Sequence, residues 1–208
     1  MDKIKLPARK IGDKVNIGHA LQKRISCRNY ERKSVTLQQL ANMLWAAQGV
    51  VSQSFTMRRT APSAGATFPL EVFVAVRKEG VDGLDQGIYQ YIPKEHALKQ
   101  INEKDVTEEL VKACFNQDFI QNAGVNLLIA AEFERTKERY ASRGERYVYM
   151  EAGSVTQNIS LEAVEQGMGT VVVGAFDDEA VQSIFGLEKW YPLAVMPVGQ
   201  PKDKKIYV

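Results

Sequence analysis

Two arginines and a serine alternate within five residues near the start of the chain, in the segment RISCR. If the segment is extended, Arg24, Ser26 and Arg28 project to the same side, so their donors can converge on one anionic group. A solvated basic loop has the same composition, and the spacing alone favours that simpler interpretation. The segment is therefore a candidate anion site whose role depends on the rest of the chain.

Two further stretches would let a ligand approach the backbone. Residues 57–69 read MRRTAPSAGATFP, a turn composition whose small side chains permit close contact. Taken alone, this loop fits an ordinary connector better. Gly174 and Ala175 follow a β-branched run, and their side chains are too small to shield their N–H groups from a flat ligand.

The remaining reactive side chains exclude several kinds of chemistry. Cys27 and Cys114 are the only cysteines and lie far apart without a CxxC pattern, which argues against a disulfide scaffold and a zinc site. His19 and His96 are the only histidines, so we expect no metal site. Triad or Cys–His catalysis lacks a recognisable elbow, and the sequence indicates no catalytic residue.

Composition and charge indicate an ordinary globular protein. The chain has 208 residues, of which 45% are hydrophobic and 25% charged. A net charge of +2 gives no general reason to expect nucleic acid or a membrane as a partner. No apolar run approaches the ~18 residues of a membrane span, and residues 1–16 are too polar for a signal peptide. We expect a cytoplasmic protein with an arm of residues 1–16 and one domain of residues 17–208.

One long helix is expected to organise this domain, over Tyr147–Gln166. Its apolar positions recur at helical spacing on one face and continue onto a second face. A helix that is apolar on two faces is a central helix or the seam of a dimer. The first face comprises Val148, Ala152, Val155, Ile159 and Ala163, and the second Met150, Gln157, Leu161 and Val164.

Helices and strands alternate through the rest of the chain, which predicts an α+β fold in one domain. A capping box of Thr36 and Gln39 begins one helix, His96 is expected at an exposed turn, and Cys114 is expected in the core. The other expected helices are 17–23, 36–48, 105–114 and 177–185. The expected strands are 71–77, 87–92, 97–101, 125–133, 170–173 and 193–198.

Three stretches in this order resemble the signatures of the nitroreductase superfamily, and most of all its SagB/ThcOx-type dehydrogenase branch. They are RISCRNY, APSAGATFPLEVFV and RYVYMEAGSVTQNISLEAVEQGMGTVVVGAF, and the likeness runs from Lys23 to Pro201. The motif RxSxR is a weak signal by itself. The motifs EAG, QN and GxGTVxVGAF, when they follow one another in that order, are a specific signal for this superfamily. The resemblance implies an α+β nitroreductase-like fold, with a central mixed sheet flanked by helices and the long helix at a homodimer interface.

The resemblance also implies an FMN site built from both subunits. Arg24 and Ser26 would bind the phosphate, and Arg28 would reach the ribityl chain and the pyrimidine edge of the ring. The backbone N–H groups of Gly174 and Ala175 would donate to flavin O4 and N5. The partner subunit would lay four small residues against the ring: Pro62, Ser63, Ala64 and Gly65.

The sequence departs from the family pattern at three places. Ala66 stands where many members have asparagine. The C-terminal Lys–Arg pair that grips the phosphate in many members is missing, which leaves Lys202, Lys204 and Lys205 as weaker substitutes. Azoline dehydrogenases of the branch have a Lys–Tyr pair before the long helix, where this chain has Arg139-Tyr140. Because arginine stays protonated, this argues against azoline oxidation.

The function implied is an FMN-dependent oxidoreductase that passes hydride from NADH or NADPH, by way of flavin N5, to a small acceptor in ping-pong order. The acceptor could be a nitroaromatic, a quinone, a free flavin or an enone. Two alternatives stay open: a thiazoline or oxazoline dehydrogenase acting with a cyclodehydratase partner, and a flavin-binding scaffold without turnover. Nucleic-acid binding through RISCR and the lysine tail is poorly supported by the near-neutral charge.

Overall fold

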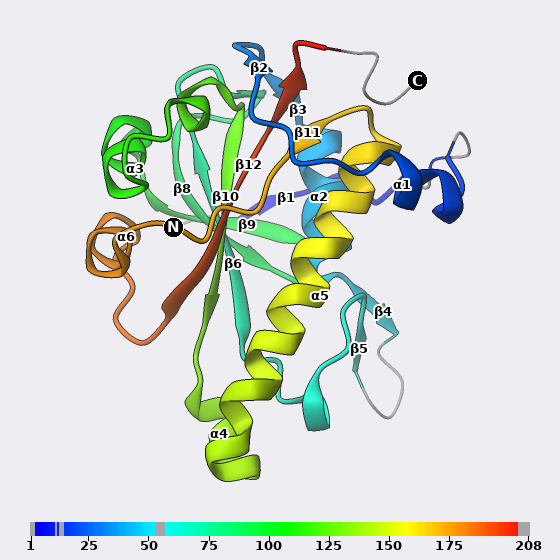
Figure 1. Cartoon of the computed structure of the whole chain (residues 1–208), viewed down its shortest axis with the longest axis vertical. Coiled ribbons are helices and arrows are strands. Elements are labelled where there is room, and N and C mark those ends of the chain that lie inside the picture. The colour runs from blue at the N-terminus through cyan, green and yellow to red at the C-terminus, as the bar shows by residue number, and fades with distance from the viewer. Residues whose placement is uncertain (1–2, 11, 13–14, 53–56, 204–208) are drawn as a thin grey trace.

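The computed structural model describes residues 3–10, 12, 15–52 and 57–203 of the chain. Its centre is an eight-stranded sheet in the order β1-β9-β8-β6-β10-β12-β11, with β2 also paired to β12 (Figure 1). The strands are β1 Lys3–Lys5, β2 Tyr30–Glu31, β6 Leu70–Val76, β8 Gly87–Ile92, β9 Ala97–Asn102, β10 Val125–Ala131, β11 Gly169–Thr170 and β12 Tyr191–Pro201.

Every pairing within this sheet is antiparallel. The expectation of a mixed sheet was therefore wrong, although the α+β class with a central sheet flanked by helices is confirmed. A parallel pair does occur outside the sheet, between β3 Val35–Thr36 and β7 Val81–Asp82. A small hairpin of β4 Val50–Ser52 and β5 Arg58–Arg59 also stands apart.

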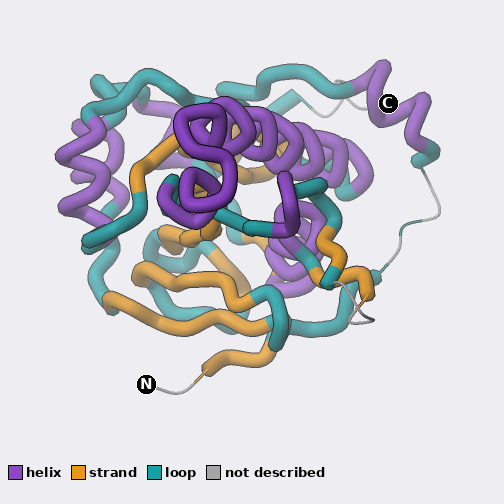
Figure 2. The backbone as a smooth tube through the Cα atoms, turned by 90° about the horizontal axis from the view of Figure 1, so that it is seen from below, coloured by secondary structure: helices purple, strands orange, loops and turns teal. Residues whose placement is uncertain are grey.

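Helices cover both faces of the sheet because its strands are apolar on both sides. Helices α2 and α5 lie on one face, and α3 and α6 on the other (Figures 1 and 2). In β6, Val72 and Val74 belong to the core under α2 and α5, while Phe73 and Ala75 belong to the core under α3 and α6. The helices are α1 Ile17–Lys23, α2 Leu37–Gln48, α3 Thr107–Ala113, α4 Glu134–Tyr140, α5 Gly144–Glu165 and α6 Asp178–Phe185, with 3-10 turns η1 Ala64–Ala66, η2 Asp118–Asn122 and η3 Ala141–Arg143.

Most expected elements are found within a few residues of their expected bounds. The capping box at Thr36 is present, with the Gln39 N–H donating to Thr36 Oγ1 at 3.1 Å. Asp177 caps α6, and Cys114 is fully buried. His96 lies in the expected turn but is half-buried, because its ring hydrogen-bonds Tyr91 Oη at 2.8 Å; its expected exposure was wrong.

The long helix α5 runs diagonally across one face of the sheet (Figure 1). Its first apolar face is buried, as expected, from Val148 through Ile159 to Ala163. The second face is divided, since Val164 is buried whereas Met150 is 65% exposed. Within the described ranges, no helix is both long and apolar enough to cross a membrane.

The first residues of the expected arm already belong to the sheet. Lys3–Lys5 pairs with Ala97–Lys99 of β9, and Leu6 is buried behind it. The division into an arm of residues 1–16 and a domain of residues 17–208 stays a prediction.

Candidate functional site

The RISCR segment leaves α1 and runs beside the chain that follows α5. Arg24 ends α1 in an extended conformation, and the Cys27 N–H donates to the Thr170 carbonyl at 2.9 Å. A Cβ at Gly169 would lie 2.6 Å from Cys27 Sγ, so only glycine lets the two backbones come this close. Cys27 is buried, while Ser26 and Arg28 are exposed and Arg24 is half-buried.

The cations of this segment have no acidic partner in the part of the chain that the structure describes. Among the described residues, neither Arg24 nor Arg28 forms an ion pair with a carboxylate. Lys202 lies nearby, because its N–H donates to the Asn29 carbonyl at 3.0 Å. Lys204, the remaining expected phosphate contact, is outside the described residues. Two arginines and a hydroxyl without an acidic partner suit a dianionic group.

Gly174 and Ala175 extend the same region. The preceding residue, Val173, pairs with Val195 of β12, and the turn then opens to solvent. No acceptor in the described part of the chain bonds to the N–H of Gly174 or of Ala175, whereas the Ala175 carbonyl accepts from Gln117 Nε2 at 3.0 Å. We call residues 24–28 with Gly174 and Ala175 the first half-site. It offers cations and free backbone donors.

The loop Pro62–Phe68, here called the PS loop, is held in an unusual conformation. Three of its residues have positive φ: Gly65 at 58°, Ala66 at 55° and Phe68 at 47°. Positive φ is uncommon for residues with a Cβ, so the surroundings must stabilise the loop. Within the loop, the Phe68 N–H donates to Ser63 Oγ at 2.9 Å.

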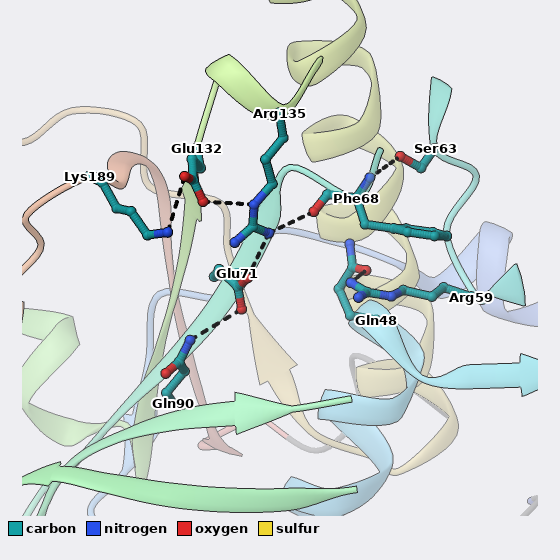
Figure 3. A network of polar contacts seen from close by, with 9 residues as sticks. All are labelled: Gln48, Arg59, Ser63, Phe68, Glu71, Gln90, Glu132, Arg135 and Lys189. Carbon is teal, nitrogen blue, oxygen red and sulfur yellow. Dashed lines mark hydrogen bonds and ion pairs between the residues drawn. The ribbon is translucent and has the colours of Figure 1, made fainter. Parts of the chain in front are cut away.

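A polar network fixes the far end of the PS loop (Figure 3). Arg135 of α4 donates to the Phe68 carbonyl at 3.0 Å and pairs with Glu71 at 2.8 Å and with Glu132 at 2.7 Å. Arg59 lies over the Phe68 ring, 4.3 Å from its centroid. The network ties the loop to β6, to the residue that follows β10 and to α4, so the loop is held in one conformation.

Arg139 and Tyr140 close the near side of the same loop. Arg139 Nη1 donates to the Gly65 carbonyl at 3.0 Å. A Cβ at Gly65 would lie 2.6 Å from Tyr140 Oη and 2.9 Å from Arg139 Cζ, so the loop and this pair are in close contact. The pair therefore lies beside the expected flavin-contacting residues.

The sequence reasoning missed a buried carboxyl behind the PS loop. Glu151 of α5 is 4% exposed, and burial raises the pKa of its carboxyl to about 7. Its position could have been read from the sequence, since Glu151 falls between Val148 and Ala152 on the buried stripe of the helix.

The structure does not bring all expected site residues together in one chain. The PS loop lies beside the N-terminal part of α5, near Tyr147 and Met150, whereas the RISCR segment lies beside the chain just after its C-terminal end. Figure 1 shows the cyan turn of the PS loop low beside α5 and the blue α1 high beside it. The helix has 22 residues and is about 33 Å long.

Comparisons with known proteins identify the family. Residues 21–200 match the family model described as "Nitroreductase family". "Putative nitroreductase MJ1384" of Methanocaldococcus jannaschii is 44% identical over 188 residues, which cover 90% of this chain and 92% of that protein. The microcin B17-processing protein McbC of Escherichia coli is 30% identical over 156 residues, 72% of this chain and 57% of McbC.

A solved structure agrees with these sequence matches. A protein of Anabaena variabilis, also described as a nitroreductase, superposes with a TM-score of 0.83 at 26% identity over 96% of this chain; the chain spans 42% of that protein. The resemblance expected from the sequence is thereby confirmed, and the match to McbC agrees with the branch named there. The chain belongs to the nitroreductase family and is an oxidoreductase with that family's α+β fold.

Proposed function

We propose that the protein is an FMN-dependent oxidoreductase that takes hydride from NADH or NADPH and passes it to a small acceptor. The observation that carries the proposal is the first half-site, where two arginines without a carboxylate partner, a hydroxyl and backbone N–H groups without an acceptor, judged over the described residues, lie along neighbouring segments. That donor set fits FMN, which combines a dianionic phosphate with hydrogen-bond acceptors on its ring.

Different residues of the first half-site would bind different parts of FMN. Arg24 and Ser26 would bind the phosphate, Arg28 the ribityl chain and pyrimidine edge, and the N–H groups of Gly174 and Ala175 the ring. When bound, FMN supplies reversible hydride chemistry that no side chain can provide. Donor and acceptor would use the same face in turn, which gives ping-pong kinetics. The acceptor would be a nitroaromatic, a quinone, a free flavin or an enone.

An absorption spectrum followed by anaerobic titration with each nicotinamide tests the proposal. We expect purified protein to be yellow, and we expect NADH or NADPH to bleach it stoichiometrically. A colourless protein that does not bind added FMN would refute every flavin-based function. A yellow protein that neither nicotinamide bleaches would instead support the flavin-binding scaffold.

The first half-site and the PS loop lie at opposite ends of α5 within one chain. This separation supports a homodimer in which each FMN is bound by both subunits. Met150 and Tyr149 of α5 are 65% and 57% exposed, although large apolar side chains prefer burial. In a two-fold dimer, the PS loop of one subunit would meet the RISCR segment of the other.

Two variants that each weaken FMN binding should complement one another at an FMN concentration between the wild-type Kd and the Kd of the variants. Arg24→Ala weakens the first half-site, and Gly65→Val disrupts the PS loop, because Gly65 has a φ of 58° and no room for a Cβ. Heterodimers isolated through two different tags would hold one doubly altered site and one intact site. We expect them to bind about half the FMN of wild type, whereas each homodimer binds little.

Heterodimers that bind no more FMN than the homodimers would show that each site lies within one chain. Light scattering that finds an FMN-loaded monomer would have the same meaning.

The match to McbC supports an azoline dehydrogenase as a second candidate, acting on a peptide together with a cyclodehydratase. Arg139 and Tyr140 lie beside the PS loop, where a pair of substrate-handling residues would be needed. The Arg139 guanidinium is, however, bonded to the Gly65 carbonyl and stays protonated, which suits loop positioning better than proton transfer. Anaerobic bleaching by a thiazoline-containing peptide, and not by either nicotinamide, would favour this candidate.

The cellular location and the partners complete the proposal. NADH and NADPH are available in the cytoplasm, where we place the protein. A net charge of +2 supports neither nucleic acid nor an anionic membrane as partner.

A further inference from the structure

A cavity of about 270 Å³ opens between the PS loop and α5. One wall is formed by Pro62, Ser63 and Ala64, and the other by residues of α5, which include Tyr147, Met150, Glu151 and Ser154. Glu151 is the buried member of this lining, being 4% exposed. A buried glutamate therefore lines a cavity whose opposite wall is the loop expected to contact the flavin.

Three buried polar atoms behind this cavity make no hydrogen bond of normal geometry among the described residues, although the Gln48 and Ser63 side chains lie close enough to Glu151 to oppose the rise of its pKa. The three atoms are Glu151 Oε1, Gln48 Nε2 and Arg59 Nε. Gln48 and Arg59 are neighbours, because Arg59 Nη1 donates to Gln48 Oε1 at 2.8 Å (Figure 3). Orphaned buried polar atoms are rare, and several in one cluster indicate a polar species that completes them.

The charges around Glu151 leave it able to gain and lose a proton near neutrality. Burial raises the pKa of its carboxyl to about 7, while the Ser63 and Gln48 side chains and the charge of Arg59 oppose the rise. Tyr147 faces the same cavity from its own helix. Two further charges act on Arg59 from β6 and α4: Glu71 and Arg135.

We infer that Glu151 is the proton donor of the site and supplies the proton that the acceptor takes up when it is reduced. The inference rests on the proposed function. Reduction of a quinone by NAD(P)H consumes one proton besides the hydride: the nicotinamide loses a hydride, and the quinone gains that hydride and a proton. Glu151 gives its carboxyl proton to a quinone oxygen, becomes a carboxylate, and recovers a proton from solvent that enters the cavity.

Glu151→Gln keeps the shape of the side chain and removes the transferable proton. We expect NADH or NADPH to bleach the FMN-loaded variant within about twofold of the wild-type rate, because that step needs no proton from a side chain. Anaerobic reoxidation by p-benzoquinone should be slower by about a hundredfold near pH 7. Reoxidation by ferricyanide, which takes up electrons and no proton, should be unchanged.

Glu162→Gln is the matched control. Glu162 is a second buried carboxyl of α5, 8% exposed, but it pairs with Arg9 at 3.6 Å and lines a different cavity. We expect the quinone rate of this variant to equal that of wild type. Equal quinone rates in Glu151→Gln and wild type, with normal bleaching, would overturn the inference and leave the proposed function standing. A failure of bleaching in wild type would overturn the proposed function itself.

Two measurements keep the test decisive if Glu151→Gln is poorly loaded with FMN. In wild type, the rate of reoxidation by quinone should fall as pH rises above about 7, while the rate with ferricyanide does not.

The second measurement is the pH dependence of Tm. The raised pKa means that folding favours the protonated carboxyl. The stability that the protonated Glu151 contributes is therefore present at low pH and is lost as pH rises towards about 7. Between about pH 5 and about pH 7, the Tm of wild type should fall more than that of Glu151→Gln, by about 5 °C. The same pH dependence of Tm in both proteins would show that Glu151 holds no proton near neutrality.

Discussion

Replacing Ala175 by proline is expected to slow bleaching of the bound flavin by a saturating nicotinamide about a hundredfold, relative to Ala175→Gly. Proline lacks the backbone N–H, and removing one preorganised donor at an atom where charge develops can cost about 3 kcal/mol. The N–H of Ala175 has no acceptor among the described residues, and its side chain is exposed, so the structure gives this donor no other partner. Stopped-flow absorbance of the two FMN-loaded variants gives the comparison.

The glycine variant is the control for backbone flexibility. Ala175→Gly keeps the N–H and should retain FMN and most of the activity, losing only some rigidity of the turn. If a folded, FMN-loaded Ala175→Pro protein bleaches as fast as Ala175→Gly, this N–H does not bind the part of the ring that accepts hydride.

Arg24→Ala should weaken FMN binding ten- to hundredfold. A charge-assisted hydrogen bond to a phosphate is worth roughly 1.5–3 kcal/mol, and each 1.4 kcal/mol changes a Kd about tenfold. Arg24 has no carboxylate partner in the described part of the chain, so no internal ion pair offsets the loss. Fluorescence titration of the apoprotein with FMN at two salt concentrations measures the change.

Arg32→Ala is the matched control for this prediction. Arg32 is exposed just beyond the segment, and its guanidinium donates to the Gln121 carbonyl at 3.0 Å. We expect its removal to leave the Kd for FMN unchanged. An unchanged Kd in Arg24→Ala as well would show that RISCR is a surface loop.

The fold was predictable where one local pattern determines each element. The apolar stripe through Val148 and Ile159 gave α5, and the Thr36 capping box fixed the start of α2. The strand β1 has only three residues and no such local pattern. It forms because it pairs with β9, which comes from the middle of the chain. The antiparallel arrangement of the sheet could not be read from any single strand either, because strand direction is set by connections across the whole fold.

The members of the candidate site and their division between two subunits stay predictions from the sequence, and the structure adds where the segments lie within one chain. RISCR, the PS loop and Gly174-Ala175 were each chosen from sequence, yet only the folded chain puts them at two ends of one helix. Glu151 was overlooked because a glutamate in a helix is usually exposed. Glu151 is 4% exposed, and the three residues that act on its carboxyl, Gln48, Arg59 and Ser63, come from three other segments of the chain.

The contacts of the RISCR segment also set an order of events during synthesis. The Cys27 N–H bonds to Thr170, and Tyr30 pairs with Pro201, so this segment is held by residues from the far end of the described chain. The PS loop is hydrogen-bonded directly to α4, within the first 140 residues of the chain. Long-range pairings form late, and a ribosome releases the N-terminal part of a chain first. The pairing of Tyr30 with Pro201 can therefore form only after residue 201 has been made, later than the hydrogen bonds between the PS loop and α4 can form.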